Sequence, residues 1–365
     1  MSIWTFLYLL FGIGLLTFGA EALVRGSSRL AALIGISPLV IGLTVVAFGT
    51  SAPELAISVR SALFDQADIS IGNVVGSNIL NILLILGACA VIQPLEVHIQ
   101  LIRVDVPIMI AVSFLFLLLG LDGHITFLDG SILFLGLLLY IAFSIRKSRD
   151  VNGLVEQEFE MEYGTTSKAS KTGIVAQLAL STVGLVLLVF GADLFVKGAT
   201  EIARAFGVSE LVIGLTIVAL GTSLPEVATS VVAALKGQRD IAIGNAVGSN
   251  IFNLLSVVGI SALAAPKGLE VAPAALNFDI PVMIAVALGC FPIFYVGSSI
   301  NRWEGALFLF YYLSYTAYLI LQSSSHSALP IFSQVMLWFV VPLTVITLVL
   351  VTIHEIGKRK KIDPS

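Results

Sequence analysis

The chain reads GTSAPE at residues 49–54 and GTSLPE at residues 221–226, and each motif lies inside a long apolar stretch. Each copy sets one carboxylate, Glu54 or Glu226, among aliphatic side chains. A charge at the centre of a membrane helix costs at least about 2.5 kcal/mol, so an acid placed twice at matching positions indicates a functional site. The surroundings of these two motifs also decide the fold.

The composition identifies the class of protein. Of the 365 residues, 58% are hydrophobic and 12% are charged, and the mean hydropathy is +1.03. Soluble domains carry about 25% charged residues. Many windows of about 20 residues here lack charge, which is the length that an α-helix needs to cross a bilayer. The sequence therefore predicts an all-α polytopic membrane protein in a lipid bilayer, whose N-terminal apolar run is a first membrane helix and not a signal peptide.

Eleven membrane-spanning helices are predicted. With the N-terminus outside, fifteen of the 19 Lys and Arg residues fall in cytoplasmic segments, so the positive-inside rule favours this orientation. We expect a multi-pass protein of the plasma (cell inner) membrane, with the central linker and the C-terminus in the cytoplasm. The expected spans are 2–23, 36–60, 69–92, 102–119, 126–145, 174–195, 209–235, 241–264, 278–297, 304–321 and 329–353.

An internal repeat organises these helices. The two glutamates lie 172 positions apart, and residues 35–87 align without gaps to residues 207–259 with 34 identities in 53 positions. Because each copy opens a series of five helices, the second copy enters the membrane from the opposite face, as in the inverted-topology repeats of secondary transporters. Channels can also be built from repeats, so a channel stays open at this point. The expected parts are a first five-helix repeat at 1–145, a cytoplasmic linker at 146–173, a second five-helix repeat at 174–321, and an eleventh C-terminal helix with a basic tail at 322–365.

The polar residues of each motif share one face of a helix, because they fall at i, i+3, i+4 and i+7. A proline in each motif breaks the helix, which a membrane tolerates only where the backbone lines a cavity in the protein. The following helix adds a serine and an asparagine four residues apart, within GSNILN and GSNIFN. The candidate residues are Ala47, Thr50, Ser51, Glu54, Ser77 and Asn81 in the first copy, and Ala219, Thr222, Ser223, Glu226, Ser249 and Asn253 in the second.

All of these candidate ligands are oxygen donors, which suit a hard cation such as Ca²⁺ with its six to eight oxygen ligands. Neither motif contains Cys or His, which argues against Zn²⁺ or Cu⁺. One Ca²⁺, several Na⁺ or protons could each neutralise the two glutamates, so exchange against H⁺ stays open. No enzyme activity is expected, since no His or Lys base lies beside Ser51 or Ser223. We also expect no cofactor apart from the transported ions, no nucleic acid and no protein partner.

Several other polar residues are given structural roles. Asn73 and Asn245, with Asp68 and Asp240, fall near the predicted starts of the third and eighth helices, where we expect them to cap the helices. Cys89 and Cys290 lie in apolar spans and are expected to be small buried hydrophobic residues.

The paired motifs, GTSAPE with GSNILN and GTSLPE with GSNIFN, resemble the two α-repeats of the cation/Ca²⁺ exchanger superfamily, specifically its prokaryotic Na⁺/Ca²⁺ exchanger branch. The H⁺-coupled branch carries Gly-Asn-Ala-x-Glu motifs, which this sequence lacks. The resemblance implies an antiporter that exchanges Ca²⁺ for Na⁺ by alternating access, with the first and sixth helices sliding over a fixed core. The alternatives are a Ca²⁺/H⁺ or other cation antiporter at the same site and, in a different class, a cation channel.

The resemblance also implies four ion sites between the second, third, seventh and eighth helices. The chain departs from some relatives in having Asn253 where they have Asp, and in its eleventh helix. Without a third carboxylate, exchange is expected not to need K⁺. The implied ligands are Glu54, Glu226, Thr50 and Thr222 for Ca²⁺; Ser51, Ser77 and the Ala47 carbonyl for one Na⁺; Ser223, Ser249 and the Ala219 carbonyl for another; and Asn81 and Asn253 at the middle.

Overall fold

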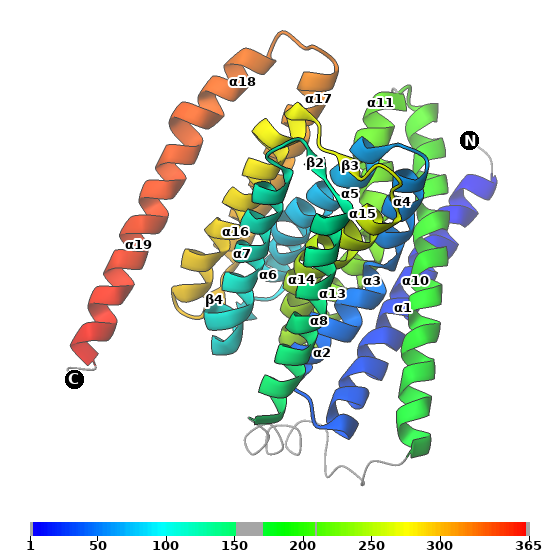
Figure 1. The fold of residues 1–365 in the computed structure, drawn as a ribbon, viewed down its shortest axis with the longest axis vertical. Helices are drawn as coiled ribbons and strands as arrows, with labels where there is room; N and C mark the ends of the chain where they lie inside the picture. Colours follow the sequence, from blue (N-terminus) through cyan, green and yellow to red (C-terminus); the bar gives the residue numbers. More distant parts are fainter. Residues whose placement is uncertain (1–2, 151–170, 209, 363–365) are drawn as a thin grey trace.

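The structure is a computed structural model that describes residues 3–150, 171–208 and 210–362. It is a bundle of helices in which α1 (Ile3–Ile34) and α10 (Lys171–Ala205) lie side by side along one flank (Figure 1). Within the described ranges, nine helices are long and apolar enough to cross a membrane, and one pair bent by 46° makes a tenth span. The predicted all-α membrane fold is confirmed.

The first repeat follows the predicted order of five spans. Its second span is the bent pair, Pro38–Thr50 and Ala52–Leu63, and its third is continuous from Ala67 to Ile92. After α1, its helical segments are α2 (Pro38–Ile41), η1 (Gly42–Val46), α3 (Ala47–Thr50), α4 (Ala52–Leu63), α5 (Ala67–Leu80), η2 (Asn81–Leu86), α6 (Gly87–Ile92), η3 (Leu101–Asp105), α7 (Val106–Gly120) and α8 (Phe127–Asp150), where η marks a π-helical turn.

The second repeat mirrors this order, and its seventh span is likewise interrupted, between α12 and α13. After α10, its segments are α11 (Glu210–Ile213), η4 (Gly214–Val218), α12 (Ala219–Gly221), α13 (Leu224–Leu235), α14 (Arg239–Phe252), η5 (Asn253–Val258), α15 (Gly259–Ala264), η6 (Ala275–Asp279), α16 (Ile280–Tyr295) and α17 (Arg302–Ser323).

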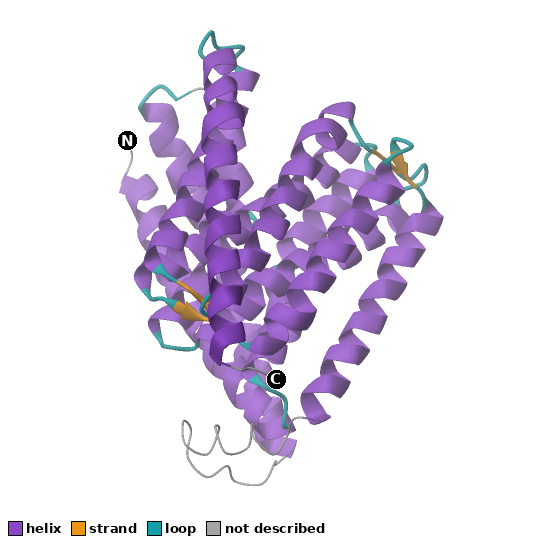
Figure 2. Ribbon diagram, turned by 90° about the vertical axis from the view of Figure 1, so that its left-hand side faces the viewer, coloured by secondary structure: helices purple, strands orange, loops and turns teal. Residues whose placement is uncertain are grey.

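Two short antiparallel ladders join the repeats. Strand β1 (Leu95–Glu96) pairs with β4 (Ser299–Ile300), and β2 (His124–Ile125) pairs with β3 (Leu269–Glu270). Figure 2 shows these ladders toward opposite ends of the bundle. Each ladder therefore fastens a loop of one repeat to a loop of the other.

Two predicted span ends are wrong. The first and sixth helices continue well beyond residues 23 and 195, so that Arg25, Arg29 and Arg204 lie on helices and not in loops. The helices continue because glycines allow close backbone contact between them: an added Cβ on Gly19 would lie 2.8 Å from the Gly184 carbonyl oxygen. The two paired helices therefore continue through the polar residues at which the prediction had ended them.

The predicted linker at 146–173 is helical at both ends, since α8 runs to Asp150 and α10 begins at Lys171. Residues 151–170 of this linker lie outside the described residues. The buried positions of Cys89 and Cys290 are confirmed.

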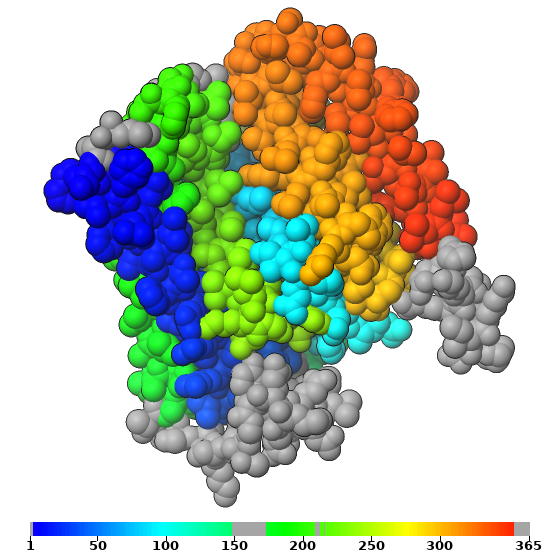
Figure 3. All heavy atoms as spheres, turned by 180° about the vertical axis from the view of Figure 1, so that it is seen from behind, coloured from blue at the N-terminus to red at the C-terminus, as the bar shows by residue number. Residues whose placement is uncertain are grey.

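The predicted eleventh helix is present as α18 (Leu329–Val335), η7 (Met336–Val340) and α19 (Val341–Ile362). It stands at the edge of the bundle, seen at the right of Figure 3, and its most apolar part contains half-buried and exposed residues but no fully buried one. The Tyr311 hydroxyl donates to Thr344 Oγ1 at 2.7 Å and ties it to α17. The ion-binding motifs lie elsewhere, in the centre of the bundle.

Candidate ion-binding site

The two motifs form broken helices, as their prolines predicted. Ser51 separates α3 from α4 with backbone angles of φ −79° and ψ 7°, and Ser223 precedes α13 with φ −90° and ψ 5°. Each proline occupies the first turn of the new helix, where a missing N–H costs no hydrogen bond. Glu54 and Glu226 lie in the same first turns, where the positive end of the helix stabilises a carboxylate.

Each glutamate is held by the serine of the opposite repeat. Glu54 is fully buried and Glu226 is 1% exposed. Ser223 Oγ donates to Glu54 Oε1 at 2.9 Å, and Ser51 Oγ donates to Glu226 Oε1 at 3.1 Å. The other carboxylate oxygen of each glutamate has no hydrogen-bond partner among the described residues. The two carboxylates therefore belong to one site at the contact of the repeats.

The third and eighth helices contribute their serines unequally. Ser77 Oγ lies 3.1 Å from Ser223 Oγ, whereas the Oγ of its counterpart Ser249 is buried without a hydrogen-bond partner. The direct bond of Ser77 is thus to the serine of the second repeat and not to Ser51, with which the resemblance had grouped it. Ser77 meets Ser223 because the broken helix of the second repeat packs beside the unbroken helix of the first.

The middle of the site is lined by amides. Asn81 Nδ2 donates to Asn250 Oδ1 at 3.0 Å, and Asn253 Nδ2 donates to Asn78 Oδ1 at 3.1 Å. In the part of the chain that the structure describes, the Oδ1 atoms of Asn81 and Asn253 have no hydrogen-bond partner, although both side chains are buried. Buried polar atoms are nearly always paired in proteins. Four acceptor oxygens, one from each glutamate and one from each of these asparagines, are thus suited to a cation.

The two predicted alanine carbonyls lie in different surroundings. Ala47 is fully buried, and its carbonyl accepts the Ser51 N–H at 3.0 Å, while Ala219 is exposed. Within the described ranges, no cluster of three or more His, Cys, Asp or Glu side chains is present. Neutral hydroxyl, amide and carbonyl oxygens therefore make up most of this donor set, which suits Na⁺ and Ca²⁺ and not a soft metal.

Comparison with known proteins agrees with this geometry. The sequence profile of the family described as sodium/calcium exchanger protein matches residues 4–146 and 176–321, which include both repeats. The chain belongs to this family. The exchanger is 39% identical over 326 residues to the putative antiporter CaxA of Alkalimonas amylolytica, a match that covers 87% of this chain and 98% of the relative.

Two further relatives extend the comparison. The sodium/calcium exchanger MaX1 of Methanosarcina acetivorans is 33% identical over 344 residues, covering 85% of this chain and 97% of the relative. A solved structure of the sodium-calcium exchanger NCX_Mj, soaked without Na⁺ and Ca²⁺, matches with a TM-score of 0.73 at 33% identity, covering 86% of this chain and 98% of that chain. The similarity thus extends over nearly the whole fold.

The prediction that Asn73 and Asn245 are helix caps is wrong. Both lie in the middle of their helices, because α5 begins at Ala67 and α14 at Arg239. Asp68 and Asp240 lie in the first turns of these helices, but the cap positions belong to Gln66 and Gln238. The sequence did contain a signal in the exchanger's first repeat, since Asn73, Ser77 and Asn81 follow one another at four-residue intervals on one helical face.

Asn78 and Asn250 are a second pair of asparagines at the site, and the sequence predicted no role for them. Asn78 Nδ2 donates to the Asn250 carbonyl at 3.3 Å, and Asn250 Nδ2 donates to the Asn78 carbonyl at 3.2 Å. These reciprocal bonds join α5 to α14, and the same side chains orient the amides of Asn81 and Asn253. They give the centre of the exchanger a rigid frame.

Proposed function

We propose that this exchanger is a secondary active antiporter that moves Ca²⁺ against Na⁺ across the membrane by alternating access. The observation that carries the proposal is a set of four buried acceptor oxygens, on Glu54, Glu226, Asn81 and Asn253, that have no hydrogen-bond partner within the described ranges. Two carboxylates with neutral oxygens around them balance one divalent cation. Membership of the sodium/calcium exchanger family supports the same pair of ions.

The serine contacts suggest how the ions are held. We assign Ca²⁺ to Glu54 and Glu226 with Thr50 and Thr222. One Na⁺ takes Ser77 and Ser223 beside Glu54, and another takes Ser51 beside Glu226 with Ser249. The crossed hydrogen bonds of Ser223 and Ser51 to the two glutamates support this grouping over one in which each Na⁺ belongs to a single repeat. The Ala47 and Ala219 carbonyls complete the two sodium positions.

The proposal also includes an orientation in the membrane and a transport class. We place the N-terminus outside and the linker and C-terminus in the cytoplasm of the plasma membrane, on the distribution of Lys and Arg. The chain is a transporter and not an enzyme. Figure 1 is consistent with this arrangement, because α1 begins at one end of the bundle and α19 ends at the other.

The coupling ion is tested by ⁴⁵Ca²⁺ uptake into proteoliposomes that hold Na⁺, K⁺ or an acidic buffer inside. We expect uptake only with internal Na⁺, because the hydroxyl oxygens beside the glutamates suit Na⁺, and we expect the same rate when all K⁺ is replaced by choline. If a proton gradient alone drives equal uptake, the coupling ion is H⁺ and not Na⁺. Single-channel currents in planar bilayers would instead identify a channel.

A further inference from the structure

Asn73 and Asn245 each connect a glutamate of one repeat with a threonine of the other. Asn245 Nδ2 donates to Ser230 Oγ at 2.9 Å and to the Glu226 carbonyl at 3.4 Å, while Thr50 Oγ1 donates to Asn245 Oδ1 at 3.0 Å. In the first repeat, Asn73 Nδ2 donates to Ser58 Oγ at 2.9 Å and to the Glu54 carbonyl at 3.2 Å. Thr222 Oγ1 donates to Asn73 Oδ1 at 3.3 Å. The same bridge is therefore built twice.

These bonds determine which way each threonine hydroxyl points. A hydroxyl has one proton and two lone pairs, and a cation binds through a lone pair. Because both N–H donors of each amide are engaged on the glutamate helix, the amide Oδ1 faces the threonine and accepts a hydrogen bond from its hydroxyl. Without this acceptor, the Thr50 proton would turn to the Val46 or Ala47 carbonyl, at 3.1 and 3.3 Å, as threonines in helices commonly do.

We propose that Asn73 and Asn245 are positioning residues that turn the hydroxyl oxygens of Thr222 and Thr50 toward the bound cation. They do not bind the cation in this scheme. The inference rests on the proposed exchange function and explains why a buried amide, Asn245, and its half-buried counterpart, Asn73, lie beside the site.

A double-mutant cycle tests this inference. Asn245→Leu should raise the KM for Ca²⁺ in Ca²⁺/Ca²⁺ exchange about tenfold, the effect of one lost hydrogen bond, with little change in maximal rate. The effects of Asn245→Leu and Thr50→Val should be non-additive, because these residues are bonded. Asn245→Leu with Thr222→Val is the matched control, and there the effects should add.

Additive effects in both combinations, or equal coupling in both, would overturn the positioning role. Asn73→Leu gives an independent measurement if Asn245→Leu does not fold. Its bonded partner is Thr222, so Thr222→Val is then the coupled change and Thr50→Val is the control. If the wild-type protein does not transport Ca²⁺, the proposed function itself is refuted. That result is obtained before any variant is made.

A second inference comes from a difference between the repeats. An added Cβ on Gly244 of α14 would lie 2.8 Å from the Leu39 carbonyl oxygen, and one on Gly248 would lie 2.6 Å from the Leu43 carbonyl oxygen. The α2–η1 segment therefore packs tightly on α14. Their counterparts on α5, Gly72 and Gly76, would meet no atom of the described residues within 4 Å. Since the two repeats are 34 of 53 residues identical here, each can adopt the packing of the other. Exchanging the two packings gives a second conformation that is closed on the opposite face.

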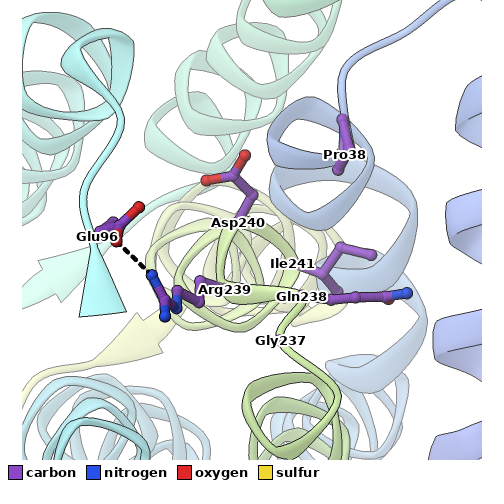
Figure 4. Close-up of a pocket in the computed structure, with 7 residues that line it drawn as sticks. All are labelled: Pro38, Glu96, Gly237, Gln238, Arg239, Asp240 and Ile241. Atoms are coloured by element: carbon purple, nitrogen blue, oxygen red, sulfur yellow. Dashed lines mark ion pairs between the residues drawn. The ribbon is translucent and has the colours of Figure 1, made fainter. Parts of the chain in front are cut away.

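Polar bonds between α1 and the turn from α13 to α14 exist in the present conformation. Glu21 Oε1 pairs with Lys236 Nζ at 2.7 Å and, on its own helix, with Arg25 at 2.7 Å. Ser28 Oγ donates to Gln238 Oε1 at 2.7 Å. Figure 4 shows Gln238 pointing away from Arg239, which pairs with Glu96 of β1 at 2.5 Å beside a small cavity. The turn is therefore bonded both to the flanking helix α1 and to the loop after α6.

The opposite face lacks the ionic part of this arrangement. The counterparts of Glu21 and Lys236 are Asp193 and Phe64, and Asp193 pairs with Lys197 on its own helix at 2.6 Å. The counterparts of Ser28 and Gln238 are Thr200, whose Oγ1 is buried without a partner, and Gln66, which is exposed. The hydrogen bond can thus re-form on this face in the second conformation, but the ion pair cannot.

We infer that Glu21 and Lys236 form a one-sided latch that favours the conformation in which α2 and η1 pack on α14. The latch controls the balance between the two conformations, and Thr200 bonds to Gln66 in the second one. This inference builds on alternating access but is tested without transport.

Disulfide formation between Thr200→Cys and Gln66→Cys, in a Cys89→Ala and Cys290→Ala background, reports the second conformation. We expect slow cross-linking by copper phenanthroline with the latch intact and several-fold faster cross-linking with Lys236→Gln. Lys236→Arg should keep the slow rate. Lys197→Gln is the matched control, since it removes a cation whose partner lies on the same helix.

Phe64→Lys provides a second and independent variant, because it supplies the missing partner of Asp193. It should accelerate the same cross-link with Lys236 still present, even if Lys236→Gln does not fold. Unchanged rates in both variants, or an equal acceleration by Lys197→Gln, would overturn the latch. The proposed ion exchange would be unaffected by that result.

Discussion

Replacing Glu54 or Glu226 by Gln is expected to reduce Na⁺-driven ⁴⁵Ca²⁺ uptake by at least about thirtyfold in either case. Glutamine keeps the size of the side chain and can still accept the hydrogen bond from Ser223 or Ser51, so the fold should survive. It removes one of two charges that neutralise a divalent ion in a buried site. Removing one partner of a buried charge pair costs about 2–5 kcal/mol, which corresponds to about thirtyfold or more in affinity.

Glu304→Gln is the matched control. Glu304 is also buried, at 3% exposed, but it caps α17 through the Asn301 N–H at 2.6 Å, outside the ion site. We expect this change to lower stability slightly and to leave exchange in place. Substantial exchange by Glu54→Gln or Glu226→Gln would contradict their assignment as Ca²⁺ ligands.

Two equivalent glycines are expected to respond to alanine in opposite ways. Gly248→Ala forces a Cβ to within 2.6 Å of the Leu43 oxygen, a backbone atom that cannot turn away. Overpacking of this kind costs about 1–3 kcal/mol, so the thermal unfolding midpoint should fall by a few degrees. Gly76→Ala has free space around it and gains about 1 kcal/mol of helix propensity, so the midpoint should hold or rise.

Transport should nevertheless be lost in Gly76→Ala, because the second conformation needs the same close packing on α5. The measurement combines the unfolding midpoint in detergent with ⁴⁵Ca²⁺ uptake for each variant. Gly289→Ala, on α16 and also without neighbours within 4 Å, should change neither property by much. A Gly76→Ala protein with full transport would contradict the exchange of packings between the repeats.

The repeat and the helical class could be predicted from sequence because they depend on local properties. Apolar windows of membrane length, the 172-residue offset and the Gly-Thr-Ser-x-Pro-Glu breaks all appear in the chain itself. The four-residue spacing also placed Glu54, Thr50 and Ser51 on one face. The helical class and the two helix breaks agree with the structure.

The partners of the site residues could not be predicted in the same way. Helical periodicity tells which residues share a face, but not which face of another helix lies opposite. For this reason the bond from Ser77 to Ser223, and the bridges made by Asn73 and Asn245, appear only in the structure. The span ends at Arg25 and Arg204 were missed because contact with a second helix, and not hydropathy, decides where α1 and α10 end.

The difference between the two halves is also a tertiary property. Gly76 and Gly248 occupy identical positions in the repeat, yet one is open and the other is in close contact. Phe64 and Lys236 occupy equivalent positions in the two repeats, and this difference is one hint in the sequence that the two faces are not equivalent.

The central claim is that one site holds Ca²⁺ and Na⁺ in turn, so that an ion crosses the membrane only when another ion crosses in the opposite direction. The most direct measurement follows ²²Na⁺ efflux and ⁴⁵Ca²⁺ uptake together in the same proteoliposomes, with external Ca²⁺ as the variable. We predict that Na⁺ leaves only when Ca²⁺ is present outside, and that the two fluxes rise together in a fixed ratio. Sodium efflux that continues at the same rate without external Ca²⁺ or Na⁺ would contradict the account.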